Sequence, residues 1–391
     1  MNTLKKIKLA DVEKLFYTNE LLDVKDIDEI DFYFDQPQKT TSPMKNPYSI
    51  EEMIEKLKKD NMTFTLEEES ECKDFLRKVN YYTFKYYAND LFGKNTEKTF
   101  TAVKATYVFD HYLRSWLHDL ISRLEVFLRS SIIDILAQNY QLDSFQPAQF
   151  YLDQEIYFEE KGKRSRTKQD RVIRVNKLYE SFHKTIQANK KTHEAIKHHE
   201  DNYSATPVWL LFDLMTLGSL STFYSLLIPK YKTLVARKMT MDVKENRLLG
   251  DLLASWIDSL RHLRNVVSHT GKIYGTNFNL LPKEHENDKL YIEELRRFHY
   301  DKRLIIHLLF MRRLFLVMSV EDRAIWDEKI EELYSKSKEN DSVLLSKIGF
   351  IDGTKEKLLI NESPKKLKDT KKIRKLAKKL LDFFVFKLSK K

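Results

Sequence analysis

The sequence predicts an all-α protein, and two observations lead to that fold class. Only 8 Gly and 8 Pro occur among 391 residues, so strong turn signals are too few for a β-sandwich or β-barrel. In several long segments, apolar residues recur at steps of three and four, which is the spacing of one face of a helix. The length favours either two domains or one domain with appendages.

The strongest helical segment runs from about Tyr107 to Tyr140. We expect it to be a long core helix because its apolar residues form one wide face. Glu125 and Arg129 are four residues apart and are expected to pair on its surface. The apolar stripe consists of Phe109, Leu113, Trp116, Leu117, Leu120, Leu124, Phe127 and Leu128.

The remaining helices are expected on both sides of this segment. One helix is expected to start after Ser49, which has capping-box spacing to Glu52, and a second is expected over 66–92. The aromatic run of this second helix is interpreted as a core wedge, with a base-stacking platform as the alternative. A segment at 207–227 is expected to be helical but interrupted by Gly218, with Ser219 or Ser221 as the cap. A further helix is expected within 246–275, where an apolar stripe runs from Leu249 to Val267, and others are expected at 292–318 and 322–339.

Composition shifts divide the chain into three regions. Residues 1–46 are interpreted as an N-terminal arm, 47–345 as a helical domain and 364–391 as a basic amphipathic C-terminal helix. A basic polar insertion is expected near 157–203. Its histidines lack the cysteines and the suitably spaced carboxylates that would complete a metal site. We therefore predict no metal and no cofactor.

The net charge of +10 and the pI of about 9.1 make nucleic acid the leading class of partner. The insertion and the tail hold the candidate RNA-binding residues, although a solvated charged surface is the alternative for both. The tail could instead dock on the core or touch an anionic membrane surface. The candidate RNA-binding residues are Arg164, Arg166, Lys168, Lys371, Lys372, Arg374 and Lys375.

Cysteine use and hydropathy indicate the compartment. The single cysteine, Cys72, excludes an intramolecular disulfide and suits a reducing cytosol. No segment approaches the roughly 20 uninterrupted apolar residues that a membrane span needs. We therefore expect a soluble, cytoplasmic protein that is not stably inserted in a membrane.

The segment RNVVSH at 264–269 holds the candidate catalytic residues Arg264, Asn265 and His269. Asn265 and His269 are four residues apart and share a helix face, and a long arginine side chain can reach toward the same groove. Arg261 and Ser268 are the supporting residues. This set of a cation, an amide, a hydroxyl and an imidazole suits a phosphodiester.

RNA cleavage without a metal needs a base, an acid and positive charge. An ordinary imidazole titrates near pH 6.5, so His269 can serve as base or acid. Arg264 would stabilise charge on the phosphorane oxygens, and Asn265 would orient either group. The expected products carry a 2′,3′-cyclic phosphate and a 5′-hydroxyl. The spacing of Arg and His alone also arises by chance, and the alternative is a helix end whose histidine caps carbonyls and whose arginine meets a carboxylate.

The chain resembles the Abi-like family related to AbiD and AbiF, whose last motif carries the signature of HEPN ribonucleases. This resemblance implies a HEPN-like helical bundle with helical N- and C-terminal additions and a phage-defence role as a toxin-like endoribonuclease. For AbiF-like members it also implies association with a small noncoding RNA. The matching pieces, from about Asn46 to about Asn277, are NPYSIEEMIEKLKK, VNYYTFKYY, YVFDHYLRSWLHDLISRLEVFLRS, PVWLLFDLMTLGSLSTFY and SWIDSLRHLRNVVSHTGKIYG.

Family members carry one Arg-to-His motif per chain, and HEPN nucleases usually combine two, so the resemblance implies a homodimer. Two similar spacings, Arg114 to His118 and Arg303 to His307, have three intervening residues instead of four to six. This chain has SHTG where many relatives carry a histidine pair, which leaves open whether Thr270 assists.

Two other functions remain open at this point. One is a non-catalytic protein that holds a structured noncoding RNA. The other is a membrane-acting toxin that uses residues 365–391.

Overall fold

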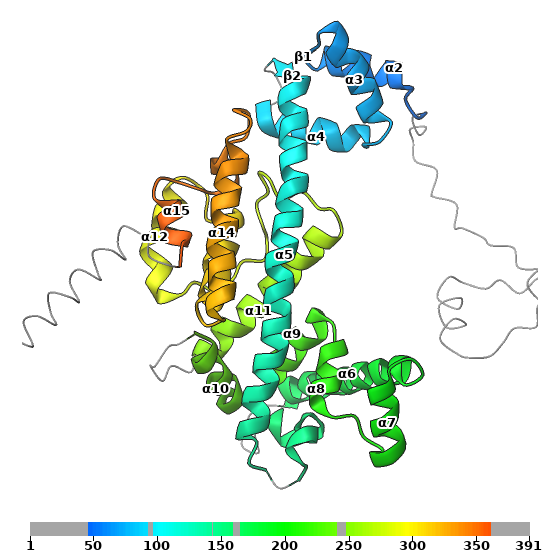
Figure 1. Cartoon of the computed structure of the whole chain (residues 1–391), viewed down its shortest axis with the longest axis vertical. Helices are drawn as coiled ribbons and strands as arrows, with labels where there is room; N and C mark the ends of the chain where they lie inside the picture. The colour runs from blue at the N-terminus through cyan, green and yellow to red at the C-terminus, as the bar shows by residue number, and fades with distance from the viewer. Residues whose placement is uncertain (1–45, 93–96, 143, 159–164, 241–247, 361–391) are drawn as a thin grey trace, which may run out of the picture. The chain divides into compact units, whose positions relative to one another are not determined.

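The computed structural model describes residues 46–92, 97–142, 144–158, 165–240 and 248–360. They form an almost entirely helical fold (Figure 1), which confirms the all-α prediction. Within them, the strands β1 (Met62–Thr63) and β2 (Lys98–Thr99) pair in parallel over two residues each. The predicted tail at 364–391 and all of the predicted arm before Asn46 lie outside the described residues, and the predicted domain boundaries remain predictions.

The described part of the chain begins with three short helices. They are α2 (Ile50–Lys59), α3 (Leu66–Leu76) and α4 (Tyr81–Phe92). The single helix expected over 66–92 is therefore wrong, because the chain breaks between α3 and α4. Thr65 caps α3 and forms a capping box with Glu68, which satisfies amide groups at the helix start.

The aromatic run of α4 divides between the core and the surface. Tyr81, Phe84 and Tyr87 are buried, whereas Tyr82 and Tyr86 keep 65% and 57% of their surface exposed. The core interpretation therefore holds for three of the five rings.

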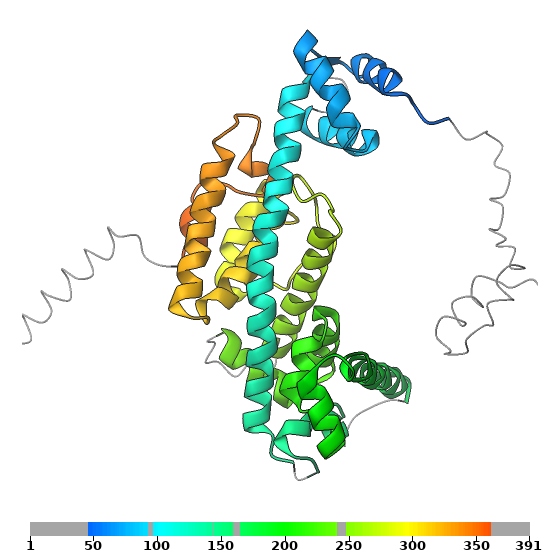
Figure 2. The same ribbon diagram turned by 45° about the vertical axis from the view of Figure 1, so that its right-hand side comes forward.

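Helix α5 (Phe100–Asn139) is the longest element, with 40 residues. It starts seven residues before the expected position, and its predicted apolar face is buried except at Phe127, which is partly buried. Helices α4, α8, α10, α11 and α14 all contact it, and Figures 1 and 2 both show α14 alongside it. The buried apolar residues of α5 from Phe109 onward and those of α11 belong to one continuous core cluster.

The helices that follow complete this core. The segment 207–227 divides into α8 (Val208–Leu214) and α9 (Leu217–Leu226). Gly218 lies inside α9, and Thr216, not Ser219 or Ser221, is the N-cap: its side chain accepts a hydrogen bond from the Ser219 amide. The later helices are α10 (Pro229–Thr240), α11 (Leu248–Ser268), α12 (Lys289–Arg297), α13 (Leu304–Leu316), α14 (Val320–Ser337) and α15 (Thr354–Leu358).

The described part of the basic insertion contains two helices, α6 (Ser165–Asn189) and α7 (Glu194–Tyr203). Two short 3-10 helices, Pro147–Leu152 and Gln154–Ile156, precede them. Helix α6 packs on α8 and α9 through buried residues such as Val175, Leu178 and Phe182. The insertion is therefore part of the fold and forms one wall of the pocket described below.

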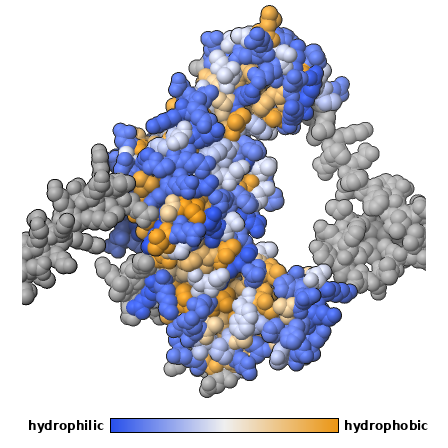
Figure 3. Space-filling view, viewed as in Figure 1, coloured by the Kyte–Doolittle hydropathy of each residue, from blue (hydrophilic) through white to orange (hydrophobic). Residues whose placement is uncertain are grey.

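Hydrophilic residues cover most of the described surface in the view of Figure 3, and hydrophobic residues form smaller patches between them. Within the described residues, no helix combines the length and the apolar character that a bilayer crossing requires.

Candidate functional site

The candidate catalytic segment forms the C-terminal end of α11. Backbone bonds of a Schellman motif close this end: the Gly271 amide donates to the Val266 carbonyl at 2.8 Å, and the Thr270 amide donates to the Val267 carbonyl at 3.3 Å. His269 is therefore the last residue before the chain turns away, and its side chain is exposed. The helix end holds the His269 backbone in place while leaving its imidazole accessible.

Thr270 has a left-handed backbone with φ of 57°. Glycine usually occupies this position of a Schellman motif because a Cβ is unfavourable there, and a β-branched residue is an outlier. A backbone of this kind costs of order 1–3 kcal/mol, and such positions cluster at functional sites. The strained residue directly follows His269.

Arg264 reaches across to α5. Its Nε lies 3.9 Å from Oε2 of Glu125, whose other carboxylate oxygen pairs with Arg129. Its Nη1 lies 3.4 Å from Oδ1 of Asn265, so the guanidinium does turn toward the face that carries Asn265. The side chain of Arg264 remains 34% exposed, which leaves donors available to a ligand.

A buried acid holds the chain that follows the helix end. Asp110 of α5 is fully buried, and its Oδ1 accepts hydrogen bonds from the amides of Ile273 at 3.0 Å and Tyr274 at 2.6 Å. Its Oδ2 accepts from the Tyr87 hydroxyl and pairs with Arg114. We call these five residues the Asp110 junction. It fixes the segment that leaves α11.

Lys272 also secures this segment, because its ammonium lies 2.8 Å from the carboxylate of Asp90 and over the rings of Tyr86 and Tyr87. Burial lowers the pKa of Lys272 from its ordinary value, although Asp90 opposes the change. Four points of contact on α4 and α5 therefore hold the residues immediately after the candidate site.

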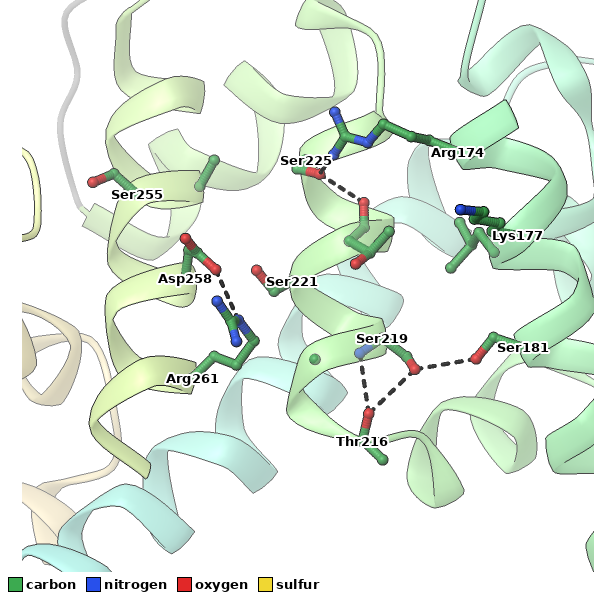
Figure 4. Close-up of a pocket in the computed structure, with 14 residues that line it drawn as sticks. Arg174, Lys177, Ser181, Thr216, Ser219, Ser221, Ser225, Ser255, Asp258 and Arg261 are labelled. Atoms are coloured by element: carbon green, nitrogen blue, oxygen red, sulfur yellow. Dashed lines mark hydrogen bonds and ion pairs between the residues drawn. The ribbon is translucent and has the colours of Figure 1, made fainter. Parts of the chain in front are cut away.

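A pocket of about 820 Å³ opens beside α11, with α9 as its floor and α6 and α11 as its walls (Figure 4). Arg261 lies in its α11 wall, where its Nε pairs with Asp258 at 2.8 Å. Arg174 and Lys177 face it from α6. The lining is completed by Leu178, Ser181, Thr216, Gly218, Ser219, Ser221, Thr222, Ser225, Ala254 and Ser255.

The predicted residues thus fall into two groups. Arg264, Asn265 and His269 gather at the end of α11 with the exposed Ser268, whereas Arg261 belongs to the pocket. The predicted RNA-binding residues of the tail, and Arg164, lie outside the described residues. Arg166 and Lys168 fall in the first turn of α6, but the described part of the structure does not include their side chains.

The two similar spacings do not form a second site of this kind. Arg114 is held in the Asp110 junction, and His307 is fully buried in α13. Burial, followed by the charge of His262, lowers the pKa of His307 to about 3. Neither pair therefore presents an arginine and a histidine together at the surface.

Sequence reasoning missed the importance of Glu125, Asp110 and Lys177. Glu125 and Arg129 do pair, as expected, but the pair is partly buried and also contacts Arg264. Asp110 stands within the apolar stripe of α5 four residues before Arg114, a pattern that could have indicated a buried ion pair. Lys177 carried no comparable signal.

Among the described residues, no group of three or more His, Cys, Asp or Glu side chains is arranged to hold a metal ion. The chemistry available at the end of α11 is that of an imidazole, a guanidinium, an amide and a hydroxyl.

Comparison with known families identifies the region of the chain that contains both the end of α11 and the pocket. A family model described as Abi-like protein matches residues 74–275, just over half of the 391-residue chain. The chain belongs to the Abi-like protein family. The match covers four of the five pieces that carried the resemblance, leaves out NPYSIEEMIEKLKK, and ends directly after SWIDSLRHLRNVVSHTGKIYG. No curated protein and no solved structure matches this Abi-like protein.

Proposed function

We propose that this Abi-like protein is an abortive-infection endoribonuclease of the HEPN type, related to AbiD and AbiF, that cleaves RNA without a metal. The observation that carries the proposal is the end of α11, where an exposed His269 follows Asn265 and a partly exposed Arg264. The family match to residues 74–275 supports the role in abortive infection.

The proposed reaction is an internal transesterification. His269 takes the proton from a ribose 2′-hydroxyl, the 2′-oxygen attacks phosphorus, and the bond from phosphorus to the 5′-oxygen breaks. The departing 5′-oxygen accepts a proton from an acid, so the products carry a 2′,3′-cyclic phosphate and a 5′-hydroxyl. Arg264 binds the phosphorane oxygens through its charged donors, and Asn265 holds the guanidinium by its side-chain carbonyl.

The acid of this reaction is proposed to be His269 of a second copy of the chain. One imidazole must be neutral to accept a proton and another must be protonated to donate one, and each chain has one RNVVSH segment. A homodimer that brings two α11 ends together would supply both groups.

The basic chain is also proposed to bind a small noncoding RNA, which would regulate cleavage. The net charge of +10 supports a polyanionic partner. The candidate RNA-binding residues in the insertion and the tail would contribute through phosphate contacts, which carry no sequence information.

The test compares His269→Ala and Arg264→Ala with wild-type protein. Loss of the acid–base group should lower the cleavage rate by about a thousandfold, and loss of the guanidinium by about a hundredfold or more. Cleavage is measured on labelled RNA in the presence of EDTA, and the product ends are identified by their response to phosphatase and to ligation. The substitutions should change the unfolding free energy little, because His269 is exposed and Arg264 is partly exposed with a single ion-pair contact, at 3.9 Å, among the described residues.

Matched controls are His111→Ala and Arg297→Ala, which remove an exposed histidine and an exposed arginine elsewhere and should retain cleavage. If both site variants cleave as fast as the controls, the catalytic assignment is wrong. If the wild type co-purifies with a defined RNA but leaves every candidate substrate intact, the protein is a non-catalytic RNA-binding protein. The pocket described above favours that second candidate, since its cations and hydroxyls suit binding.

A further inference from the structure

The pocket between α6, α9 and α11 has the size and the lining of a binding site that the proposed reaction does not use. Its volume of about 820 Å³ lies within the range of roughly 300–1,000 Å³ that is usual for ligand sites. We propose that it holds the sugar–phosphate backbone of single-stranded RNA next to the cleavage site. The inference rests on the proposed ribonuclease function and specifies where its substrate lies.

The charges of the lining favour an anion. Among the described residues that line the pocket, three are cations, Arg174, Lys177 and Arg261, and one is an acid, Asp258. Asp258 pairs with Arg261 at 2.8 Å, while Arg174 donates to the Ser225 hydroxyl at 3.1 Å. Lys177 has no ion-pair partner among the described residues. The two cations of α6 are therefore available to phosphate groups.

The neutral part of the lining favours a backbone over a base. Seven of the lining residues carry a hydroxyl, and none is aromatic, so the pocket lacks the rings on which proteins stack nucleobases. Hydroxyls and cations are the groups that bind phosphate and ribose. Figure 4 shows Ser219, Ser221 and Ser225 along the floor between the cations of the two walls.

The hydroxyls are also held in place. The Ser181 and Ser219 hydroxyls lie 3.2 Å apart across the boundary between α6 and α9, and the Thr216 hydroxyl lies 3.2 Å from that of Ser219. This series of neighbouring hydroxyls links the α6 wall of the pocket to its α9 floor. The pocket is therefore organised before a ligand binds, which lowers the entropy cost of binding.

The same face of α11 continues from the pocket to the candidate catalytic residues. Asp258, Arg261 and Asn265 follow at steps of three and four residues, so they lie along one stripe. His269 is one further step of four along the same stripe, about 6 Å beyond Asn265 at 1.5 Å per residue. A strand that occupies the pocket is thereby directed toward His269, whereas Arg264 approaches from the α5 side.

The experiment measures RNA binding by the full-length protein in a His269→Ala background, which prevents cleavage during titration. A fluorescein-labelled single-stranded RNA of mixed sequence is titrated by anisotropy at several salt concentrations. Arg174→Ala with Lys177→Ala should weaken binding about tenfold and reduce the slope of log affinity against log salt by about 1.4, because each lost phosphate contact contributes about 0.7 for a single strand. Both residues are exposed on α6, so the fold should persist.

Two further variants sharpen the result. Asp258→Asn removes the acid of the pocket and frees Arg261, so binding should become about threefold tighter through reduced repulsion of phosphate. Lys238→Ala is the matched control, because it removes an exposed lysine of α10 that does not line the pocket, and it should bind like its parent. An Arg174 and Lys177 double variant that matches the Lys238 control in affinity and in salt slope would overturn the assignment.

The outcome separates this inference from the proposed function. Wild-type protein that binds RNA without cutting it, together with weaker binding by the pocket variants, would uphold the pocket and reject the ribonuclease. Wild-type protein that cuts RNA, together with pocket variants that bind RNA like the control, would reject the pocket and uphold the ribonuclease.

Discussion

Two acids of α5 contact opposite ends of the segment that carries the candidate site, and they differ in how completely they are paired. Asp110 and Glu125 each pair with the arginine four residues further along the helix. Asp110 is fully buried and also accepts hydrogen bonds from the two amides that follow α11 and from Tyr87. Glu125 stays 14% exposed, and its additional contact is a 3.9 Å approach to Arg264.

This difference in pairing makes Asp110 a fixed support for the segment that carries the candidate site and Glu125 an adjustable one. A buried acid that uses both oxygens in several short hydrogen bonds has one favourable arrangement. A partly exposed acid shared between two arginines, one of them distant, allows the second arginine to reorient when a phosphate arrives. We infer that the Asp110 junction sets the backbone after His269, while Glu125 keeps Arg264 near the site without occupying all of its donors.

The largest expected effect is a loss of stability, and it tests the role of Asp110 as the fixed support. Asp110→Asn should lower the unfolding free energy by about 3 kcal/mol or more, because it leaves the buried Arg114 without its counter-charge. Urea denaturation measures the change. Asp119→Asn, which removes a partly exposed acid from the same helix, should cost less than about 1 kcal/mol; equal losses in the two variants would contradict the distinction.

The next effect tests the adjustable support. Glu125→Gln should lower kcat for RNA cleavage about tenfold, or about 1.4 kcal/mol in activation free energy, while changing KM and the unfolding free energy little. The physical reason is that Arg264 loses the charge that holds it near the site. Glu125 would then be a positioning residue, and Glu125→Asp should restore part of kcat. A purely structural role would instead lower stability and leave kcat unchanged.

Alkaline pH should also destabilise the Asp110 junction, through its residue Tyr274. Burial raises the pKa of Tyr274 to about 12, and the unfolded value is about 10. The phenol is therefore more easily ionised in the unfolded chain, so the stability linked to it is fully present below pH 10 and is lost as the pH rises toward 12. By pH 11 the loss should be about 1.4 kcal/mol.

Denaturation of wild-type and Tyr274→Phe protein between pH 8 and 11 measures this contribution, because the variant should lose correspondingly less stability over that range. Tyr203→Phe, which alters an exposed ring, should follow the wild type. Parallel pH profiles for wild type and Tyr274→Phe would show that the fold does not raise the pKa of this phenol.

The smallest expected effect concerns Thr270, which lies in the sequence between Arg264, near Glu125, and Ile273, which Asp110 holds. Thr270→Gly should raise the unfolding free energy by about 0.5 kcal/mol, since relief of a left-handed Cβ exceeds the entropy cost of a glycine. Thr270→Ala, which keeps the Cβ, should gain less. Cleavage by Thr270→Gly tests whether the threonine assists at the site, and a Thr270→Gly protein less stable than the wild type would exclude strain as a feature of this position.

The helices could largely be predicted from the sequence, because their apolar periodicity is local. The boundary between α3 and α4 was missed since the residues between them include neither Gly nor Pro, and the break before α9 was misplaced because Gly218 was taken as the breaker instead of Thr216 as the cap. The position of Arg264, Asn265 and His269 at a helix end was also expected.

The contacts that support those residues could not be predicted. Asp110 and Ile273 are 163 positions apart, and no local pattern connects them. The pocket combines residues of three helices, each of which has an unremarkable polar surface by itself. Only the packing of α6 and α11 against α9 brings these residues to one cavity.

The single cysteine determines how the proposed dimer can be observed. Cys72 is fully buried, and burial raises the pKa of its thiol to about 12, so it remains protonated and unreactive toward maleimides. A cysteine introduced at Ser268, which is exposed beside His269, would therefore be the one position that a spin label modifies. The separation of two such labels reports directly whether two α11 ends meet.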